Sequence, residues 1–357
     1  MVRYNNFVTK IKKCMKNKFY KLSIICAAFA LVSILVSCEK KYTVPEWEWD
    51  DQEQEANPEI TKLGWSVADF GELPKYISVY SSPNNIQSKK VRAYIAVADM
   101  SQAKFEILGD VYYNESKNGW GADALHTPSE FYTSSKAPIV INGGLFYFAN
   151  NFYYSQNLVI KNGKLLAPNQ NYYSKDWVKL WYPTLGAFCY MKDGSYSTTY
   201  TYMGNDKINY CYPEPADNDI NKDPLEVPSA TFPAGGKVLE AQTAIGGVTV
   251  LIKNGQIKNT YVQEMLDISA ASNHPRTAIG ITADKKMILF VCEGRNATDG
   301  ISGLTTLDVA NIMKDLGCVE ALNLDGGGSS CMLVNGKSTI KESDGKQRKV
   351  LTAVILK

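Results

Sequence analysis

The sequence predicts an α+β fold with one main domain, built on a mixed, mostly antiparallel β-sheet with few helices. Short apolar or alternating runs separated by turn residues are typical of strands, and they occupy residues 91–99, 104–108 and 138–141. Asn-Gly pairs between strand-like flanks indicate hairpins, because a type I′ turn requires positive φ at both central positions. Such pairs lie at 162–163, 254–255 and 335–336. An apolar content of 45% is enough for a packed core.

One helix is predicted over residues 306–316, because the apolar residues of this segment recur on a single helical face. Thr305 or Thr306 is placed to cap the first turn, which contains Asp308, and Gly317 is placed to end the helix. We therefore expect this helix to pack its apolar face on the sheet.

The first 37 residues are typical of a bacterial lipoprotein signal peptide. Lysines between positions 10 and 21 precede an uncharged apolar run at 22–37, which is shorter than the roughly 20 residues that a membrane span prefers. The run ends in Leu-Val-Ser-Cys, which looks like a lipobox, so Cys38 is the expected lipidation site. The alternative is an uncleaved membrane anchor. We expect a lipid-anchored protein of the bacterial outer membrane, either periplasmic or surface-exposed.

The rest of the chain divides by composition. Residues 38–60 are acidic and proline-punctuated, which is typical of a solvated tether. A lead-in segment at 61–90 precedes the main domain, which is expected to span 91–357. Within that domain, residues 204–236 are polar and rich in proline, and this favours a surface loop insertion.

Charge and cysteine content narrow the possible partners. A net charge of +2 argues against a dedicated nucleic-acid binder, which would carry a concentrated basic face. Cys189 and Cys211 could pair in an oxidising compartment, but no cysteine has zinc-ligand spacing and the chain has only two histidines. The sequence therefore predicts neither a metal nor a cofactor.

The segment from Asn323 to Ser330 carries the strongest chemical signal. Asp325 is followed by three glycines, Gly326, Gly327 and Gly328, and then by Ser329 and Ser330. Three consecutive glycines allow the backbone to approach a ligand closely and to direct several N–H groups at an anion. The alternative is a wide β-turn in which Asp325 only forms the turn.

Three further segments place polar residues at the ends of apolar strands. They contain Asn142 with Gly143, Arg276 with Thr277, and Glu293 with Arg295. Arg276 is either a solvated edge charge or a planar clamp for a phosphate or carboxylate group. Singly, each of these segments is a weak signal.

In their order along the chain, the four segments resemble the phosphodiester glycosidase family over roughly residues 91–357. The DGGGSS segment at 325–330 is the most specific part. The chain departs from the family at Leu145, where Phe is frequent, and at Glu293, where Asp is frequent. The resemblance implies hydrolysis of a bond between the anomeric carbon of a sugar and a phosphodiester oxygen. The carbohydrate or glycan-phosphate substrate would belong to an envelope or host glycan.

The resemblance and the chemistry together suggest roles for these residues. A phosphate monoester leaves without full protonation, so one carboxylate and an anion pocket could suffice. Asp325 and Glu293 are the candidate carboxylates, and Arg276 with the amides of residues 326–328 is the candidate phosphate pocket. The expected substrate-binding residues are Asn142, Gly143, Thr277, Arg295, Asn323, Gly326, Gly327, Gly328, Ser329 and Ser330. All four segments should meet in one cleft.

The competing hypothesis is a non-catalytic, glycan-binding surface lipoprotein. In that case aromatic residues would stack on sugars, and the glycine-rich segment would only shape a groove. The candidate aromatic residues are Tyr147, Tyr153, Tyr154, Tyr172, Tyr173, Trp177 and Trp181. Turnover of a sugar-1-phosphodiester would distinguish the enzyme from the binder.

Overall fold

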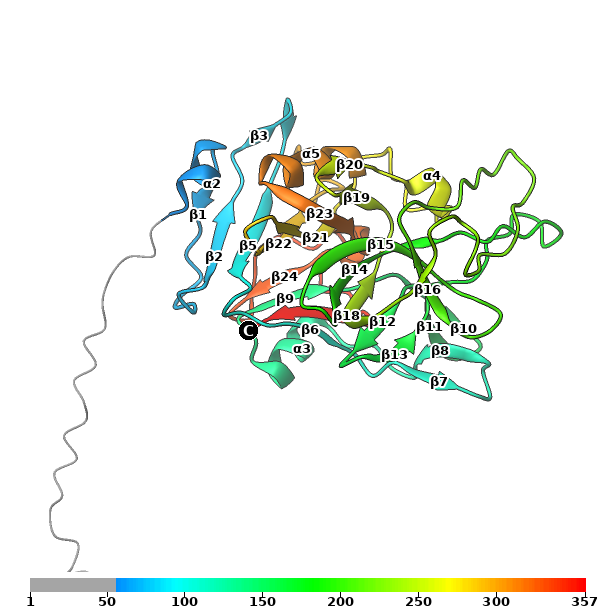
Figure 1. The fold of residues 1–357 in the computed structure, drawn as a ribbon. Helices are drawn as coiled ribbons and strands as arrows, with labels where there is room; N and C mark the ends of the chain where they lie inside the picture. Colours follow the sequence, from blue (N-terminus) through cyan, green and yellow to red (C-terminus); the bar gives the residue numbers. More distant parts are fainter. Residues whose placement is uncertain (1–55) are drawn as a thin grey trace, which may run out of the picture. The chain divides into compact units, whose positions relative to one another are not determined.

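The computed structural model describes residues 56–357, which belong to one compact unit comprising residues 54–357. An antiparallel sheet of eight strands runs through this unit (Figure 1). Its strand order is β1 (Ser66–Val67), β2 (Ile77–Ser81), β5 (Ala93–Asp99), β22 (Lys286–Cys292), β21 (Arg276–Thr282), β23 (Cys318–Asn323), β19 (Val250–Lys253) and β20 (Gln256–Ile257). The predicted signal peptide and Cys38 lie outside the described residues.

Four further sheets complete the strand content of the described chain. A five-stranded sheet has the order β25 (Lys337–Ser338), β24 (Met332–Val334), β9 (Ile139–Asn142), β26 (Ala353–Leu356) and β6 (Phe105–Leu108). A seven-stranded sheet has the order β13 (Lys164–Ala167), β12 (Val159–Lys161), β18 (Ala241–Gly246), β14 (Leu185–Met191), β15 (Tyr196–Met203), β16 (Asn209–Tyr212) and β17 (Lys237–Val238). The smaller sheets are β10 (Phe146–Ala149), β11 (Phe152–Ser155), β8 (Gly119–Ala122) and β7 (Tyr112–Asn114), and the pair β3 (Asn85–Ile86) and β4 (Lys89–Lys90).

Helices contribute little to the described residues. They are α2 (Pro58–Lys62), α3 (Pro128–Ser135), α4 (Tyr261–Glu264) and α5 (Thr306–Asp315), with a 3₁₀ turn η1 at Gly327–Ser329. Among residues 56–357, every strand pair within the three large sheets is antiparallel. The predicted α+β fold is therefore confirmed in outline, but it is dominated by sheet, and these sheets are antiparallel rather than mixed. No helix in this part of the chain is long and apolar enough to span a membrane.

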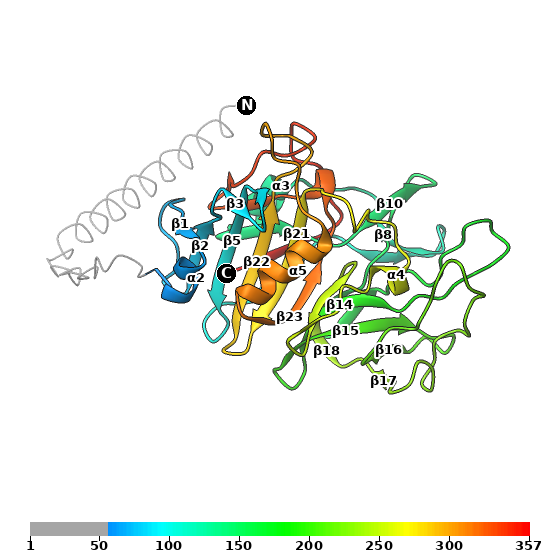
Figure 2. The same cartoon turned by 90° about the horizontal axis from the view of Figure 1, so that it is seen from above.

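The central strands β22, β21 and β23 of the eight-stranded sheet are buried on both faces because they are mostly apolar. On β21, Ile279 and Ile281 pack on one face, in a core shared with β9 and β14, whereas Ala278 packs on the other face with helix α5. Figure 2 shows α5 lying across β21, β22 and β23. Gly280 allows this close packing, since a Cβ there would lie 2.7 Å from the Met313 methyl carbon. The predicted packing of the helix on a sheet is confirmed.

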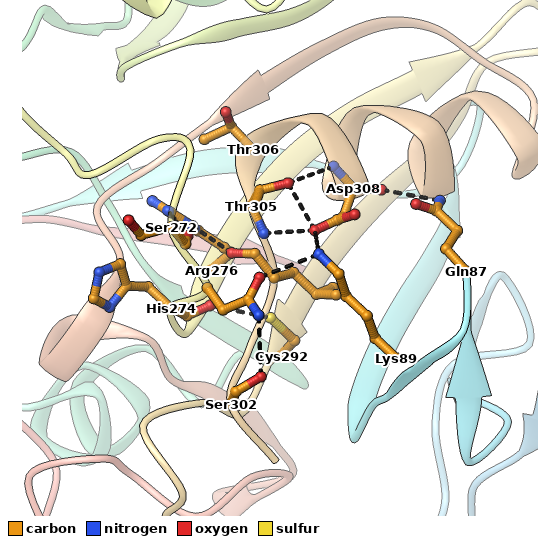
Figure 3. Close-up of polar contacts among 12 residues, drawn as sticks. Gln87, Lys89, Ser272, His274, Arg276, Cys292, Ser302, Thr305, Thr306 and Asp308 are labelled. Atoms are coloured by element: carbon orange, nitrogen blue, oxygen red, sulfur yellow. Dashed lines mark hydrogen bonds and ion pairs between the residues drawn. The ribbon is translucent and has the colours of Figure 1, made fainter. Parts of the chain in front are cut away.

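Helix α5 begins where the sequence predicts and ends one residue before the predicted end, at Asp315. The Thr305 side chain accepts a hydrogen bond from the Asp308 N–H, and the Asp308 side chain accepts one from the Thr305 N–H. Gly317 follows the helix with a φ of 85°. Lys89 of β4 adds an ion pair of 2.5 Å to Asp308 (Figure 3). This contact fixes the start of α5 to the β3–β4 hairpin.

All three predicted Asn-Gly hairpins are present. They join β12 to β13, β19 to β20 and β24 to β25. In each turn the Asn and the Gly both have positive φ, with values of 53° and 72° at 162–163, 50° and 71° at 254–255, and 48° and 76° at 335–336. These are the backbone signs that a type I′ turn requires.

Several predicted boundaries differ from the structure. Helix α2 begins at Pro58 and buries Ile60, so folded structure starts inside the segment assigned to the tether. The lead-in segment at 61–90 supplies β1 and β2 to the eight-stranded sheet. The insertion at 204–236 contains β16, whose Tyr210 and Tyr212 are buried, so only its later part is loop.

Cys189 and Cys211 are free thiols, because β14 and β16 lie on opposite sides of β15.

Candidate active site

Asp325 lies where the chain crosses from the eight-stranded to the five-stranded sheet, between β23 and β24. Its backbone is held from both directions. The Asp325 N–H donates to the Gly143 carbonyl at 3.1 Å. The side-chain amide of Asn142 donates to the Asp325 carbonyl at 2.7 Å. These bonds bring together two segments that are about 180 positions apart in the sequence.

Asn142 organises this crossover from a fully buried position at the end of β9. Its Oδ1 accepts hydrogen bonds from the Thr277 hydroxyl at 2.8 Å and from the Cys331 N–H at 3.2 Å. The Thr277 hydroxyl also lies 3.2 Å from the Ser330 hydroxyl. Both ends of the Asn142 amide are thus bound by protein, so its direct role is to position Asp325. The sequence suggested that Asn142 and Thr277 contact substrate. In the structure, their side chains bind protein groups instead.

The Asp325 carboxylate is the most perturbed acid of this site. Burial raises its pKa from 3.8 to about 6. The Ser329 hydroxyl and the Gly326 N–H bind the carboxylate and oppose this shift, as do the charges of Arg348 and Arg295. The residue itself remains partly exposed. A carboxylate in this state is mostly ionised at neutral pH and can still exchange a proton, as a catalytic base must.

The three glycines after Asp325 are needed for different steric reasons. A Cβ on Gly326 would lie 2.9 Å from the Pro275 carbonyl oxygen. Gly327 has a φ of 59°, and Gly328 lies under the side chains of Arg348 and Asp344. The run therefore permits close approach of the β21 backbone on one side and of a charged pair on the other.

The predicted nest of three free amides does not form. The Gly326 N–H donates to the Asp325 carboxylate at 2.8 Å, and the Gly327 N–H donates to the Pro275 carbonyl at 2.9 Å. Internal acceptors use both groups because the segment turns tightly into η1 against the start of β21. Of the three amides, only that of Gly328 has no acceptor among the described residues, and Gly328 itself is buried.

Arg276 is not placed as a phosphate clamp. Arg276 is 2% exposed, and its guanidinium donates four hydrogen bonds to backbone carbonyls. The acceptors belong to Leu304, Ile268, Ser269 and Ser272, at 2.7–3.0 Å. Figure 3 shows the side chain reaching Ser272 beside the start of α5. Burial lowers its pKa to about 10, so it remains a cation at neutral pH. Its charge holds the 268–272 segment in place.

Two other arginines carry the positive charge near Asp325. Arg295, on the loop after β22, and Arg348, on the loop before β26, both flank the glycine run and have half-exposed side chains. Asp344 pairs with both, at 3.9 Å from Arg295 and 2.6 Å from Arg348. Arg348 also donates to the Ser329 hydroxyl at 3.5 Å. These planar cations suit an oxyanion better than the enclosed Arg276 does.

His274 completes this exposed side of the site. Its Nδ1 accepts a hydrogen bond from Arg295 at 3.5 Å. Burial, followed by the nearby charges of Arg276 and Arg295, lowers the pKa of His274. The neutral ring can therefore act as an acceptor that orients Arg295.

Glu293 has contacts other than those expected of a carboxylate that attacks substrate. It is 1% exposed, and its Oε1 accepts a hydrogen bond from the Lys341 N–H at 3.0 Å. Arg92 lies 3.8 Å from the same oxygen. Its Oε2 has no hydrogen-bond partner within the described chain. Glu293 thus anchors the start of the loop that carries Asp344 and Arg348.

Asn323 is also used internally. It is 1% exposed and pairs with Ala278 across β21 and β23. Its amide nitrogen donates to the carbonyls of Val248 and Leu324. Ser329 and Ser330 are buried in the crossover, where their hydroxyls contact Arg348 and Thr277 respectively. The Asn323 amide nitrogen therefore serves the scaffold, whereas its Oδ1 has no hydrogen-bond partner among the described residues.

The expected meeting of Asn142 with Asp325 is confirmed, and the Arg276 and Arg295 segments adjoin the same glycine run. Sequence reasoning missed Arg348 and Asp344. Both lie in a charged segment, KESDGKQRK at 341–349, that reads as solvated loop. One sequence signal bears on their position. The Asn-Gly hairpin at 335–336 turns the chain back toward this crossover.

The fold and the site together define a class of protein, an antiparallel α+β domain in which an acid and two arginines surround a glycine-rich crossover. The family profile described as phosphodiester glycosidase matches residues 135–357, more than half of the chain. The chain belongs to the phosphodiester glycosidase family.

Two curated relatives match over part of their length. The chain is 32% identical over 106 residues to the SPbeta prophage-derived uncharacterized protein YomE of Bacillus subtilis, covering 30% of this chain and 16% of YomE. It is 30% identical over 113 residues to N-acetylglucosamine-1-phosphodiester alpha-N-acetylglucosaminidase of Mus musculus, covering 28% of this chain and 21% of the mouse protein. The matched region thus spans about a fifth or less of each relative.

Solved structures share the fold. The zebrafish N-acetylglucosamine-1-phosphodiester alpha-N-acetylglucosaminidase catalytic domain, auto-inhibited by its pro-peptide, aligns with a TM-score of 0.52 at 19% identity, covering 82% of this chain and 86% of that one. A hypothetical protein from Synechocystis aligns with a TM-score of 0.53 at 15% identity, covering 85% of this chain and 64% of that one. At these identities the alignments establish the fold alone.

Proposed function

We propose that this protein hydrolyses the bond between the anomeric carbon of a sugar and a phosphodiester oxygen in an envelope or host glycan. The observation that carries the proposal is the Asp325 carboxylate, whose pKa is raised to about 6 beside Arg295 and Arg348. Family membership supports the same reaction class. The name of the mouse relative describes an enzyme that acts on an N-acetylglucosamine-1-phosphodiester.

In the proposed reaction Asp325 acts as nucleophile or as base at the anomeric carbon. As nucleophile, its carboxylate forms a bond to that carbon while the carbon–oxygen bond to phosphate breaks, and the phosphate monoester leaves with the electron pair. Water then releases the sugar from Asp325. As base, Asp325 takes a proton from the water that attacks the carbon directly. Because a phosphate monoester is a good leaving group, a second carboxylate to protonate it is not required.

Arg295 and Arg348 are the proposed phosphate ligands. Their guanidinium groups flank the glycine run, and the Gly328 amide adds an N–H on the same segment. Without substrate, Asp344 forms ion pairs with both arginines. An incoming phosphodiester would compete with Asp344 for these two cations. Arg276 and Glu293 are positioning residues in this scheme, the first for the 268–272 segment and the second for the loop that starts at Lys341.

The test is a panel of sugar-1-phosphodiesters incubated with the full chain, with release of the phosphate monoester as the measurement. We expect turnover of at least one compound, and none with Asp325→Asn at equal concentration. If no compound is cleaved by the folded wild-type protein, the hydrolase proposal fails. The aromatic cavity described below then favours the second candidate, a non-catalytic glycan-binding lipoprotein.

The raised pKa of Asp325 predicts an acid limb in the pH profile. As base or nucleophile, Asp325 must be ionised, so kcat/KM should fall about tenfold per pH unit below pH of about 6, where the carboxyl becomes protonated. The measurement is kcat/KM across pH 4 to 8 with one substrate. A limb that lies near the ordinary pKa of Asp, 3.8, would contradict the assignment.

We also propose that the protein is attached to the bacterial outer membrane through lipid on Cys38, with residues 1–37 removed. The apolar run that ends in Leu-Val-Ser-Cys supports this. Cys38→Ala should yield an unprocessed or released protein, measured by fractionation and mass spectrometry. Detection of residues 15–37 on the mature wild-type protein would refute processing at Cys38.

A further inference from the structure

An aromatic cavity of about 460 Å³ opens in the described part of the chain. Its lining includes four aromatic side chains and two amides, those of Tyr147, Tyr172, Tyr173, Trp177, Gln156 and Gln170. A second cavity of about 420 Å³ shares Tyr173, Leu266 and Asp267 with the first. The two cavities adjoin each other at these shared residues, and together they are called the aromatic groove.

The aromatic groove begins at the residues that position Asp325. Leu145 lines the first cavity, and it lies two residues after Gly143, whose carbonyl binds the Asp325 N–H. Two residues of extended chain cover at most about 7 Å. The second cavity is lined by the 268–272 segment that Arg276 holds through its carbonyls. Pro275, the neighbour of Arg276, binds Gly327 directly. Both walls of the groove therefore start at the Asp325 crossover.

The lining has the chemistry of a site for uncharged sugar rings. Aromatic faces pack against apolar surface, while amides and hydroxyls can bind ligand hydroxyl groups. The Gln156 amide donates to Gln170 Oε1 at 2.9 Å, and the Gln170 amide donates to the Tyr172 carbonyl at 2.7 Å, so both amides are held in fixed orientations. Among the described residues that line the two cavities, none is Lys, Arg or His. This composition disfavours an anionic ligand, which belongs instead at Arg295 and Arg348.

Trp177 is presented to solvent at the edge of the groove. Its side chain is 80% exposed, an unusual state for an indole that has no ligand. Its φ of 60° is a strained value for a bulky residue. The Ser174 hydroxyl accepts a hydrogen bond from the backbone N–H of Trp177 at 2.8 Å, and this bond maintains the backbone conformation.

We propose that the aromatic groove binds a neutral oligosaccharide that continues from the sugar phosphate bond cleaved at Asp325. The substrate would then be a phosphodiester-linked glycan with several sugars, and its uncharged rings would stack along Tyr147, Tyr172 and Trp177. This inference rests on the proposed function, because it assigns the substrate class of the same site.

The test uses binding without chemistry. Full-length Asp325→Asn is applied to an array of neutral oligosaccharides, their monosaccharides and their sulfated counterparts. Neutral oligosaccharides should be retained in preference to the other two groups. Adding Trp177→Ala or Tyr172→Ala should weaken the retained interactions at least about tenfold, as loss of a stacking partner requires. Phe148→Ala is the matched control, because Phe148 neighbours Tyr147 on β10, is 58% exposed and does not line the groove.

The outcomes separate the two proposals. Retention of sulfated glycans only, retention of none, or equal binding by Trp177→Ala and Phe148→Ala would overturn the groove assignment even if sugar-1-phosphodiesters are cleaved. Trp177-dependent retention of neutral glycans without cleavage of any phosphodiester would uphold the groove as a neutral-glycan site, and would overturn both the hydrolase proposal and the link between this glycan and a bond cleaved at Asp325. Thermal unfolding of each variant establishes that the lost binding is not lost folding.

Discussion

Asp325→Asn is expected to lower kcat at least about a hundredfold, the low end of the range for a group that transfers protons in catalysis. The substitution keeps the shape of the side chain and removes the charge that attacks the anomeric carbon or accepts the proton of water. Binding should suffer much less than turnover, because the phosphate is held by Arg295 and Arg348 in the proposed complex. Steady-state kinetics on the cleaved substrate, with the dissociation constant measured separately, gives both quantities.

Stability provides the control for this variant. Folding raises the pKa of Asp325 from 3.8 to about 6, so the folded state holds the proton more tightly than the unfolded state. The stabilising effect is therefore complete below about pH 4 and is lost as the pH rises through 6. Asn removes the ionised group, so Asp325→Asn should unfold at the same temperature as wild type or higher at pH 7. If the folded variant keeps near wild-type turnover, Asp325 only forms the turn, and Glu293 becomes the leading carboxylate.

Arg276→Met is expected to lower the free energy of unfolding by on the order of 3 kcal/mol or more. The substitution leaves buried carbonyls of the 268–272 segment and of Leu304 without their donor, and each unsatisfied buried group costs about 1–3 kcal/mol. In a domain of this size the melting temperature should fall by roughly 5–10 °C. Hydrogen exchange should show the largest loss of protection near residues 268–272 and 304.

Lys179→Met serves as the matched control for Arg276. It also removes one cation, but Lys179 is half-exposed and pairs at 2.7 Å with the exposed Asp223. Such a surface ion pair contributes little to stability, so the control should unfold close to wild type. If Arg276→Met instead keeps the wild-type melting temperature and only raises KM, Arg276 is a substrate clamp after all.

Much of the fold could be predicted because local backbone chemistry determines it. Asn-Gly pairs adopt the two positive φ values of a type I′ turn at little cost, so the hairpins at 162–163, 254–255 and 335–336 follow from the dipeptides themselves. Helix α5 carries its own capping box between Thr305 and Asp308, together with a single apolar face. Neither feature depends on distant parts of the chain.

The sequence by itself also singled out the segment at Asp325, because three glycines in a row after an acid are more than an ordinary turn needs. What it could not decide is which polar side chains face a ligand. Asn142, Asn323 and Arg276 are residue types that bind substrates in many sites, yet here burial leaves them only protein carbonyls, amides and hydroxyls to bond. Arg348 looks like ordinary loop charge, yet the loop before β26 returns it to Ser329. Tertiary structure made this division, because it encloses some polar side chains among protein donors and acceptors and leaves others at the surface, where they can meet a substrate.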